Sequence, residues 1–302
     1  MDVSVIIVNY KTANLICDCV TSIIEKTREI TYEVIVVDND SEPDFEEKIK
    51  KSIPDNLFPS FKFIALNKNI GFGRANNEGL KIAKGRNIFF LNPDTLLLNN
   101  AIKILSDFLD NHPAAGACGG NLFDCSLQPS YSFKRFLPGV FWELNDLLNI
   151  LPEKLIYRNN RFFNHTNSYI EVGYISGADL MVKSKTLEET GGFRKEYFLY
   201  FEETDLCYRI KRKGWKIYSV PDAKIQHLES RSFSSSSEYQ NSFKTECIEG
   251  SRNIYYNLNK SSAARFVSQF IYQIFLDSRI ILIKSKPKKE YYRQRKKYFK
   301  HK

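Results

Sequence analysis

The segment Val3-Ser-Val-Ile-Ile-Val8 is an almost continuous run of β-branched residues. The segment Glu33-Val-Ile-Val-Val37 repeats this pattern and leads directly into the polar residues Asp38-Asn-Asp-Ser41. A strand that is apolar on both of its faces is typical of a parallel sheet buried between two layers of helices. These two segments therefore predict an α/β fold.

Further strands and amphipathic helices alternate along the rest of the chain. The sequence pattern predicts strands at 61–66, 87–91, 174–182 and 216–220, and helices at 14–26, 76–83, 101–111, 140–151, 204–213, 243–258 and 263–283. Such alternation favours a mostly parallel central sheet with right-handed crossover helices on its faces. Ligands of these sheets bind beyond the carboxyl ends of the strands. Polar residues at those ends are therefore the first candidates for a binding site.

The bulk composition favours a globular protein of the cytoplasm. The chain has 302 residues, of which 43% are hydrophobic and 26% charged. Its six cysteines form no CxxC pair and have no histidine cluster beside them, which argues against a zinc site or a disulfide framework. We find no signal-peptide pattern and no apolar run of the roughly 18 residues that a spanning helix needs.

The formal charge of +9 comes from one end of the chain. Residues 284–302 contain ten Lys or Arg and one Glu, so that 34 basic and 34 acidic residues remain in 1–283. A nucleic-acid binder would need a basic face on the fold itself, and we expect no nucleic-acid partner. The apolar helix predicted at 263–283 and the basic tail suit docking on an anionic membrane surface. A packed helix followed by a solvated tail fits the same pattern.

Two predicted strands end in acids that are suited to a nucleotide and a metal. Asp38 and Asp40 follow the second strand, where a carboxylate can accept hydrogen bonds from a base or a ribose. Asn92-Pro-Asp94 follows the strand at 87–91, and Asp94 is a hard oxygen ligand suited to Mg²⁺ or Mn²⁺ on a diphosphate. Taken alone, both groups also fit ordinary turns and helix caps.

Three further groups have two interpretations each. Gly71 and Gly73 precede a helix and allow close backbone approach, with Arg74 placed to meet a phosphate, although two glycines usually mark a turn. Glu202-Glu-Thr-Asp205 begins a predicted helix, where acids act either in catalysis or as partners of the helix dipole. His227 is a metal-ligand candidate that follows a strand, or an incidental histidine.

In this order, the segments resemble family 2 glycosyltransferases with the GT-A fold, and in particular their bacterial rhamnosyltransferase-like branch. The resemblance covers roughly residues 3–232 and is carried by Val3-Ser-Val-Ile-Ile-Val-Asn-Tyr10, Val36-Val-Asp-Asn-Asp-Ser41, Asn69-Ile-Gly-Phe-Gly-Arg-Ala-Asn-Asn77, Phe90-Leu-Asn-Pro-Asp-Thr95, Ser176-Gly-Ala-Asp-Leu-Met-Val182, Gly191-Gly-Phe193, Tyr200-Phe-Glu-Glu-Thr-Asp-Leu-Cys-Tyr-Arg209 and His227. Each segment is weak alone, and their agreement in order is specific.

The resemblance implies a role for each candidate. The donor nucleotide would be bound by Asn9, Asp38, Asp40, Gly71, Arg74, Asn77 and Asn92. Asp94 matches the second acid of the family's DXD metal motif, with Asn92 in place of the first, and His227 would join the metal, Mn²⁺ or Mg²⁺. Glu203 matches the catalytic base and would be supported by Glu202 and Asp205. The paired acids read Glu-Glu here, where Glu-Asp is commoner.

The resemblance also implies the reaction and its setting. We expect an inverting transferase that uses a dTDP- or UDP-sugar, with dTDP-β-L-rhamnose as the best candidate. The acceptor would be a saccharide or an undecaprenyl-diphosphate-linked glycan of cell-surface polysaccharide synthesis, at the inner face of the plasma membrane. A nucleotidyltransferase remains the alternative, although Val8-Asn-Tyr-Lys-Thr12 lacks the glycine-rich loop that it would need.

The predicted organisation has three parts. A GT-A domain spans 1–232 and carries an acceptor-side insertion at about 121–170. Helices follow at 233–283, and a basic tail occupies 284–302.

Overall fold

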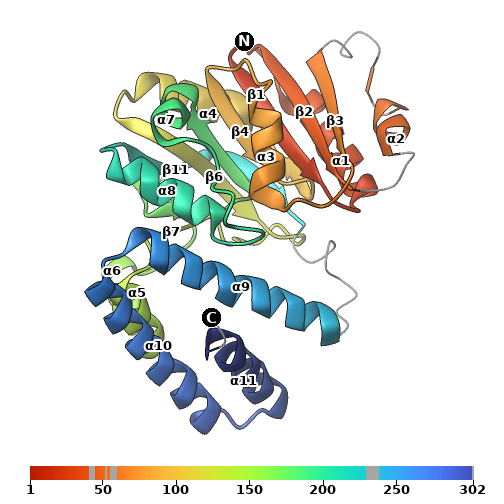
Figure 1. The fold of residues 1–302 in the computed structure, drawn as a ribbon. Coiled ribbons are helices and arrows are strands. Elements are labelled where there is room, and N and C mark those ends of the chain that lie inside the picture. Colours follow the sequence, from red (N-terminus) through yellow and green to blue (C-terminus); the bar gives the residue numbers. More distant parts are fainter. Residues whose placement is uncertain (41–44, 52, 55–59, 229–237, 301–302) are drawn as a thin grey trace.

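A central sheet with helices on both faces forms the body of the protein (Figure 1). The computed structural model describes residues 1–40, 45–51, 53–54, 60–228 and 238–300. Within them, nine strands make one sheet in the order β3-β2-β1-β4-β10-β6-β11-β5, with β8 paired to β11. The predicted α/β fold with a C-terminal helical extension is confirmed. The strands of this sheet are β1 (Val3–Asn9), β2 (Tyr32–Asn39), β3 (Phe61–Leu66), β4 (Asn87–Leu91), β5 (Thr95–Leu97), β6 (Ala115–Phe123), β8 (Ile170–Glu171), β10 (Asp179–Lys183) and β11 (Lys216–His227).

The parallel half of the sheet is built from β3, β2, β1 and β4. All seven residues of β1 are buried, which confirms that this strand is covered on both faces. Val3, Val5 and Ile7 pack into one core cluster, whereas Ile6 and Val8 pack into the other. This separation follows from the two-residue period of a strand, which sends successive side chains to opposite faces.

Helices cover the two faces of the sheet. On the face of Val5, the core includes residues of α1 (Ala13–Lys26), α2 (Phe45–Lys51) and α4 (Ala101–Asn111). On the face of Ile6, it includes residues of α3 (Phe72–Leu80), α7 (Ser184–Thr190) and α8 (Glu202–Arg212). The sequence pattern did not predict α2, α7 or β6, and it placed the start of α3 at Asn76 instead of Phe72.

The strand predicted at 174–182 is divided into two. Tyr174–Ile175 forms β9, which pairs with β7 (Phe133–Lys134) in a separate two-stranded sheet. After the turn at 176–178 the chain enters the central sheet as β10, antiparallel between β4 and β6. The prediction of one strand was wrong because the two halves pair with different partners, a non-local property that an apolar pattern does not encode.

Strand β11 continues beyond the point where Pro221 was expected to end it. Its pairing with β6 is irregular between Ser219 and Lys224, and Pro221 lies within this irregularity, where a proline is tolerated in a sheet. The strand therefore reaches His227, which is its last residue instead of part of a following loop.

The insertion at about 121–170 contains two helices in place of the one predicted at 140–151. Asn149 and Ile150 have positive φ angles of 55° and 57°, and this left-handed backbone separates α5 (Val140–Leu147) from α6 (Leu151–Tyr157). The first residues of the insertion, Asn121 to Phe123, belong to β6 and hence to the central sheet.

A second layer lies beneath the sheet and consists of α9 (Glu238–Asn259), α10 (Ser262–Leu282) and α11 (Lys286–Lys300) (Figure 1). Buried ion pairs hold it together: Arg252 lies 2.6 Å from Glu143 of α5, and Arg295 of α11 lies 2.5 Å from Glu249 of α9. The basic segment is thus a packed helix through residue 300. The predicted domain boundary at 232 lies outside the described residues. Among the described helices, none combines the length and the apolar character needed to cross a bilayer.

The contact between α3 and the sheet depends on Gly79. A Cβ atom at this position would lie 2.6 Å from Cγ2 of Ile6 and 3.2 Å from Cγ2 of Val37, both in the core. We expect Gly79→Ala to lower the free energy of unfolding by about 1–3 kcal/mol, as overpacked cores do. Urea denaturation measures the change, and Lys81→Ala, at an exposed position on the same segment, is the matched control with an effect within about 0.5 kcal/mol. An equal stability of Gly79→Ala and the parent would contradict this packing.

Candidate functional site

Asn9 and Asp38 lie side by side at the carboxyl ends of β1 and β2. They are register partners, and the Asn9 side-chain amide donates a hydrogen bond of 2.9 Å to Oδ1 of Asp38. The amide oxygen of Asn9 accepts from the backbone N–H and the hydroxyl of Thr12, at 3.2 and 2.7 Å. These bonds fix the direction of the Asp38 carboxylate at the edge of the sheet. Asp40 follows with a positive φ of 74° and an exposed side chain.

The glycine loop packs against another segment of the chain. Gly71 has a φ of 93°, and a Cβ atom there would lie 2.5 Å from the carbonyl oxygen of Phe198, to which the N–H of Phe72 donates at 3.0 Å. A Cβ atom at Gly73 would lie 3.0 Å from Cβ of Phe193 and 3.3 Å from Cβ of Glu202. The close approach that these glycines permit is to residues 193–202, whereas the assignment of Gly71 to the donor nucleotide stays a prediction.

Arg74 and Asn77 hold the same segment. Nε of Arg74 donates to the carbonyl oxygen of Lys195 at 2.7 Å. The side-chain amide of Asn77 forms two bonds with the backbone of Phe193, donating at 2.7 Å and accepting at 2.9 Å. The resemblance assigned both residues to the donor nucleotide, whereas their hydrogen bonds in the structure position the chain that leads into α8.

Asp94 and His227 form a buried pair. Strands β5 and β11 are antiparallel, with Thr95 opposite His227, and this pairing brings Oδ1 of Asp94 to 3.2 Å from Nε2 of His227. The backbone N–H of Leu228 also donates to the Asp94 carbonyl oxygen at 2.8 Å. Two residues 133 positions apart in the sequence are thus adjacent because two strands pair.

The donor set at this pair fits Mg²⁺ or Mn²⁺. Such ions commonly keep several waters and use one or two protein ligands together with substrate phosphate oxygens. Asp94 and His227 offer one oxygen and one nitrogen ligand, and within the described residues no group of three or more His, Cys, Asp or Glu could hold a metal. Diphosphate oxygens and water would have to supply the remaining ligands.

A thiol lies beneath the turn that carries Asp94. Sγ of Cys19, on α1, is 3.7 Å from the carbonyl oxygen of Asn92 and 3.6 Å from Oγ1 of Thr95. Burial raises the pKa of this thiol to about 12. The hydroxyl of Thr95 donates to the Asn92 carbonyl at 2.7 Å, so a side chain at the end of the turn bonds to the residue at its start.

The paired acids lie at the start of α8. Glu202 is buried, with 3% of its surface exposed, and burial together with the charge of Glu203 raises its pKa well above the usual range. Burial also raises the pKa of Glu203, whose Oε1 accepts from the Thr204 hydroxyl at 3.1 Å. A carboxyl group with a raised pKa is suited to accept a proton near neutral pH.

One short turn connects the metal candidate with the acids. The N–H of Asn92 donates to the carbonyl oxygen of Ala178 at 3.0 Å. On the other side of the same turn, a Cβ atom at Gly177 would lie 3.5 Å from Cγ of Glu203. The strand ends that carry Asp38 and Asp94 and the start of α8 therefore meet along one edge of the sheet.

The sequence did not single out two tyrosines beside the acids. The hydroxyls of Tyr131 and Tyr174 are 2.6 Å apart, and the Trp142 ring stacks on Tyr174 with a centroid separation of 6.1 Å. Burial raises the pKa of both tyrosines, and the charge of Glu203 adds to this shift. Tyr131 and Trp142 belong to the aromatic insertion, and its composition was the only sequence feature that pointed to them.

Asp179 is a second residue that the sequence did not single out. It is fully buried, its Oδ2 accepts from the backbone N–H of Gly120 at 2.6 Å, and burial raises its pKa well above the usual range. It lies opposite Leu91, directly before the Asn92 turn. Asp179 is the acid of the quoted segment Ser176-Gly-Ala-Asp-Leu-Met-Val182, which was the available indication.

Asp205, which the resemblance placed in support of Glu203, is a buried carboxylate that holds α8 in place. Its side chain has no exposed surface and accepts four hydrogen bonds. The donors are Arg194 at 2.9 Å, Arg209 at 2.8 Å, Asn259 at 2.7 Å and Tyr197 at 3.3 Å. These bonds attach α8 to the segment before it and to the end of α9.

Comparisons with known proteins identify relatives of this chain. The family model described as Glycosyl transferase family 2 matches residues 4–177, more than half of the chain. The N-acetylglucosaminyl-diphospho-decaprenol L-rhamnosyltransferase of Mycobacterium tuberculosis is 28% identical over 199 residues, which are 58% of this chain and 61% of that protein. The dTDP-rhamnosyl transferase RfbF of Shigella flexneri is 27% identical over 209 residues, 68% of this chain and 63% of that protein. The matches thus span less than two thirds of these relatives.

Solved structures share the fold. The mannosyltransferase PcManGT from Pyrobaculum calidifontis, in complex with GDP-Man and Mn²⁺, has a TM-score of 0.59 at 15% identity and covers 98% of this chain and 84% of that one. S. aureus TarS has a TM-score of 0.56 at 19% identity and covers 94% of this chain and 44% of that one. At these identities the likeness concerns the fold alone.

The Asp205 network predicts a large loss of stability when the carboxylate is removed. Asp205→Ala leaves Arg194 and Arg209 without their buried partner, and we expect the free energy of unfolding to fall by about 3–5 kcal/mol. Thermal or urea unfolding measures this change. Glu290→Ala, which removes the partner of Arg293 in an exposed pair, is the matched control and should change stability by less than about 1 kcal/mol. Equal effects of the two substitutions would rule out a structural role for Asp205.

Proposed function

The chain belongs to glycosyl transferase family 2, and we propose that it moves a sugar from a nucleoside diphosphate to an acceptor hydroxyl with inversion of configuration. One observation carries the proposal. The turn at 176–178 touches Asn92 on one side and Glu203 on the other, so the candidate metal pair and the candidate base border the same edge of the sheet. In the transfer reaction the donor diphosphate, at the metal, and the acceptor hydroxyl, at the base, have to lie next to each other.

The donor would bind across the carboxyl ends of β1, β2 and β4. Asp38, oriented by Asn9, would accept hydrogen bonds from the base or ribose. Asp40, two residues further along the chain, and Asn92, directly after β4, would contribute to the same site. Asp94 and His227 would hold Mn²⁺ or Mg²⁺. The ion, when bound, neutralises the charge that develops on the diphosphate leaving group.

The acceptor would lie on the other side of the turn. The Glu203 carboxylate takes the proton of the acceptor hydroxyl, whose oxygen forms a bond to the anomeric carbon. The bond from that carbon to the diphosphate oxygen breaks, and its electron pair leaves with the diphosphate. A single displacement of this kind inverts the anomeric centre. Trp142, stacked on Tyr174 beside Glu203, offers an aromatic surface for a sugar ring.

The names of two relatives support L-rhamnose as the transferred sugar. One is described as a dTDP-rhamnosyl transferase and the other as an L-rhamnosyltransferase acting on a diphospho-decaprenol-linked sugar. We propose dTDP-L-rhamnose as the donor and a lipid-linked saccharide, such as an undecaprenyl-diphosphate glycan, as the acceptor. Such an acceptor would bring the protein to the cytoplasmic face of an anionic membrane.

The proposed roles predict two inactive variants. Asp94→Ala removes a metal ligand and Glu203→Gln removes the base, and each should lower transfer by at least about 100-fold. The assay measures the release of nucleoside diphosphate, in the presence of Mn²⁺, from dTDP-rhamnose and from a panel of UDP- and GDP-sugars. Glu196→Gln, at an exposed position, is the matched control and should keep full activity. Full activity of either test variant would refute the role given to that residue.

The raised pKa of Glu203 predicts the pH dependence of transfer. The base is active only as the carboxylate, so kcat/KM should rise with pH as Glu203 loses its proton. Because burial raises its pKa above the model-compound value of 4.5, this acidic limb should lie above pH 4.5. A pH profile between 4 and 9, with circular dichroism to verify that the protein stays folded, measures it. A limb at or below the usual glutamate value would contradict the assignment.

A further inference from the structure

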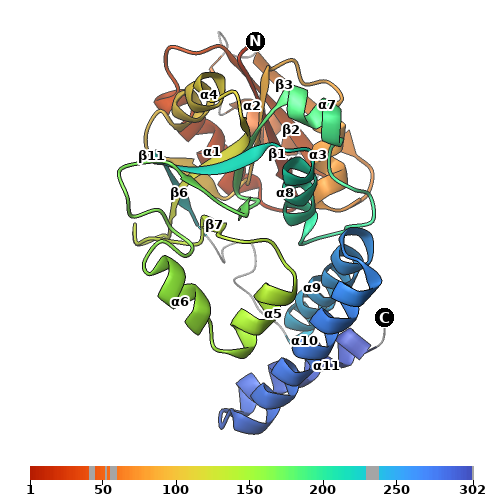
Figure 2. The same cartoon turned by 90° about the vertical axis from the view of Figure 1, so that its left-hand side faces the viewer.

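Three helices expose apolar side chains on one outer side of the protein. The apolar face, as we name it, comprises side chains that are each between 39% and 74% exposed, on or next to α5, α6 and α10: Phe141, Leu144, Leu148, Leu151, Leu155, Ile156, Phe266, Val267, Phe270, Ile274, Ile281 and Leu282. Helix α5 lies beside α10 in Figure 1, and Figure 2 shows α5 between α6 and α10. Exposed apolar patches of this extent mark interaction surfaces.

Helix α10 shows that the apolar face is distinct from the core. Tyr272, Phe275 and Leu276 point inward and form a buried cluster with residues of α5 and α11. Phe266 and Phe270 point outward, with 71% and 59% of their surfaces exposed. Helix α10 therefore has a second apolar side that is exposed and takes no part in the buried cluster.

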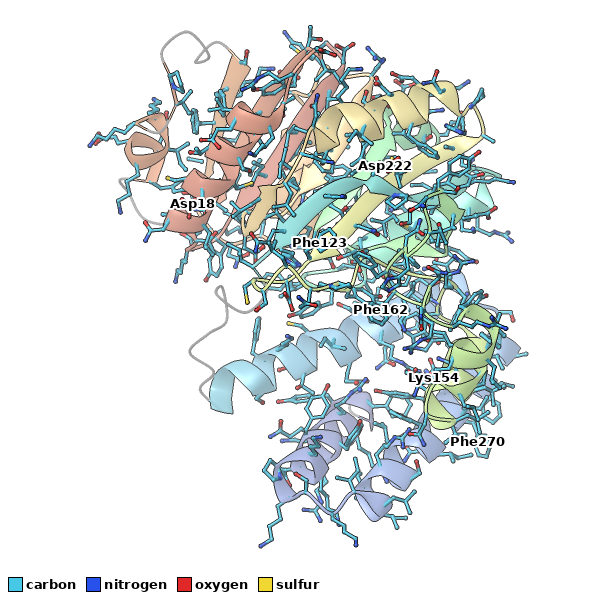
Figure 3. All side chains as sticks on the ribbon, turned by 180° about the vertical axis from the view of Figure 1, so that it is seen from behind. Asp18, Phe123, Lys154, Phe162, Asp222 and Phe270 are labelled. Carbon is cyan, nitrogen blue, oxygen red and sulfur yellow. The ribbon has the colours of Figure 1, made fainter. Side chains whose placement is uncertain are left out.

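Cations lie along this face. Lys154 of α6 is exposed and directly precedes Leu155 and Ile156, and Figure 3 shows it on the same outer side as Phe270. Arg158 is exposed one position beyond the end of α6. Arg265 directly precedes Phe266 at the start of α10. The apolar face is thus bordered by positive charge on two of its three helices.

A basic cavity of about 610 Å³ lies beside the start of α10. Its charged lining consists of one acid, Glu189, and five cations, of which Arg194 and Arg209 are paired with Asp205. The other three, Arg212, Lys213 and Lys260, are the cations that the cavity offers to an anion. Lys260 extends over the rings of Tyr208 and Tyr255, at 4.8 and 5.4 Å, and burial lowers its pKa. A Cβ atom at Gly139, directly before α5, would lie 3.6 Å from its Nζ, so Lys260 connects the cavity with the apolar face.

We propose that α5, α6 and α10 dock on an anionic phospholipid bilayer, with the apolar face in the headgroup boundary and the basic cavity on a lipid phosphate. Apolar side chains bordered by Lys and Arg are the composition of a helix surface that lies on such a membrane. This inference goes beyond the proposed reaction and does not depend on the sugar that is transferred.

The docking surface differs from the one that the sequence suggested. The sequence assigned membrane contact to the basic tail, together with the helix at 263–283. In the structure the tail is α11, where Arg295 is paired with Glu249 and Lys296 with Asp277. Two basic residues of the tail are therefore paired with acids of α9 and α10. The proposed docking surface uses α5 and α6, from the insertion, together with α10.

Vesicle flotation of the full chain tests the proposal. We expect binding to vesicles of 70% phosphatidylcholine and 30% phosphatidylglycerol, and at least about tenfold weaker binding to pure phosphatidylcholine. The triple variant Leu155→Ser, Phe266→Ser, Phe270→Ser should lose at least about tenfold in partitioning. The pair Arg212→Glu, Lys213→Glu should lose binding to the anionic vesicles by a similar factor.

Matched control variants distinguish binding through the apolar face and the basic cavity from non-specific binding by other exposed residues. Leu127→Ser with Ile82→Ser removes exposed apolar residues elsewhere, and Lys26→Glu with Lys68→Glu reverses exposed charges elsewhere, so both pairs should bind as the parent does. Inorganic phosphate at millimolar concentration should not release the protein, since the bilayer is the proposed ligand.

Several outcomes would overturn docking. They are equal binding to neutral vesicles, unchanged partitioning of the triple variant, release by free phosphate, or a stable dimer in gel filtration that the triple variant abolishes. Calorimetric binding of dTDP to every variant reports separately on the nucleotide site, so failure of docking and failure of the proposed function are distinguishable.

Discussion

The arrangement of the candidate site depends on one buried carboxylate. Asp205 has no contact with solvent, and an isolated charge in such a place would be strongly destabilising. Two arginines, a tyrosine and an asparagine compensate it, and they come from the segment before α8, from α8 itself and from the end of α9. Because Asp205 is two residues from Glu203, the same bonds that satisfy the charge set the position of the candidate base. The acid motif therefore contains one residue that holds the helix and another that faces the turn at Gly177.

Much of the fold was predictable because its information is local. Continuous apolar runs predicted the buried parallel strands. The observed bounds of β3, β4 and α4 equal the predicted ones. The errors occur where distant pairing decides the structure. The division of β9 from β10, the extension of β11 past Pro221 and the break between α5 and α6 depend on partners or backbone angles that an apolar pattern does not specify.

For the site, the sequence pointed to the strand ends but did not separate contacts within the protein from contacts with a ligand. Residue type and order predicted that Asp38, Asp94 and Glu203 lie at one edge of the sheet. In the structure Asp38 and Asp94 follow β2 and β4, which both pair with β1, and Glu203 contacts the turn that bonds to Asn92. The same reasoning could not distinguish a glycine that admits a phosphate from one that admits Phe198, nor an amide that binds a nucleotide from Asn77, which binds Phe193. It also overlooked Tyr131 and Tyr174, because their proximity to the acids arises from the packing of the insertion and leaves no spacing in the sequence.

The thiol of Cys19 has a consequence for metal selectivity. Thiolate sulfur is the soft ligand that draws zinc and cadmium away from oxygen sites, and it binds only after losing its proton. Burial raises the pKa of this thiol to about 12, which disfavours the thiolate at physiological pH. The turn above it thus presents carboxylate oxygen and imidazole nitrogen alone to an incoming ion. A cysteine beneath the Asp94 turn is compatible with a preference for hard divalent cations because the fold holds it in its uncharged form.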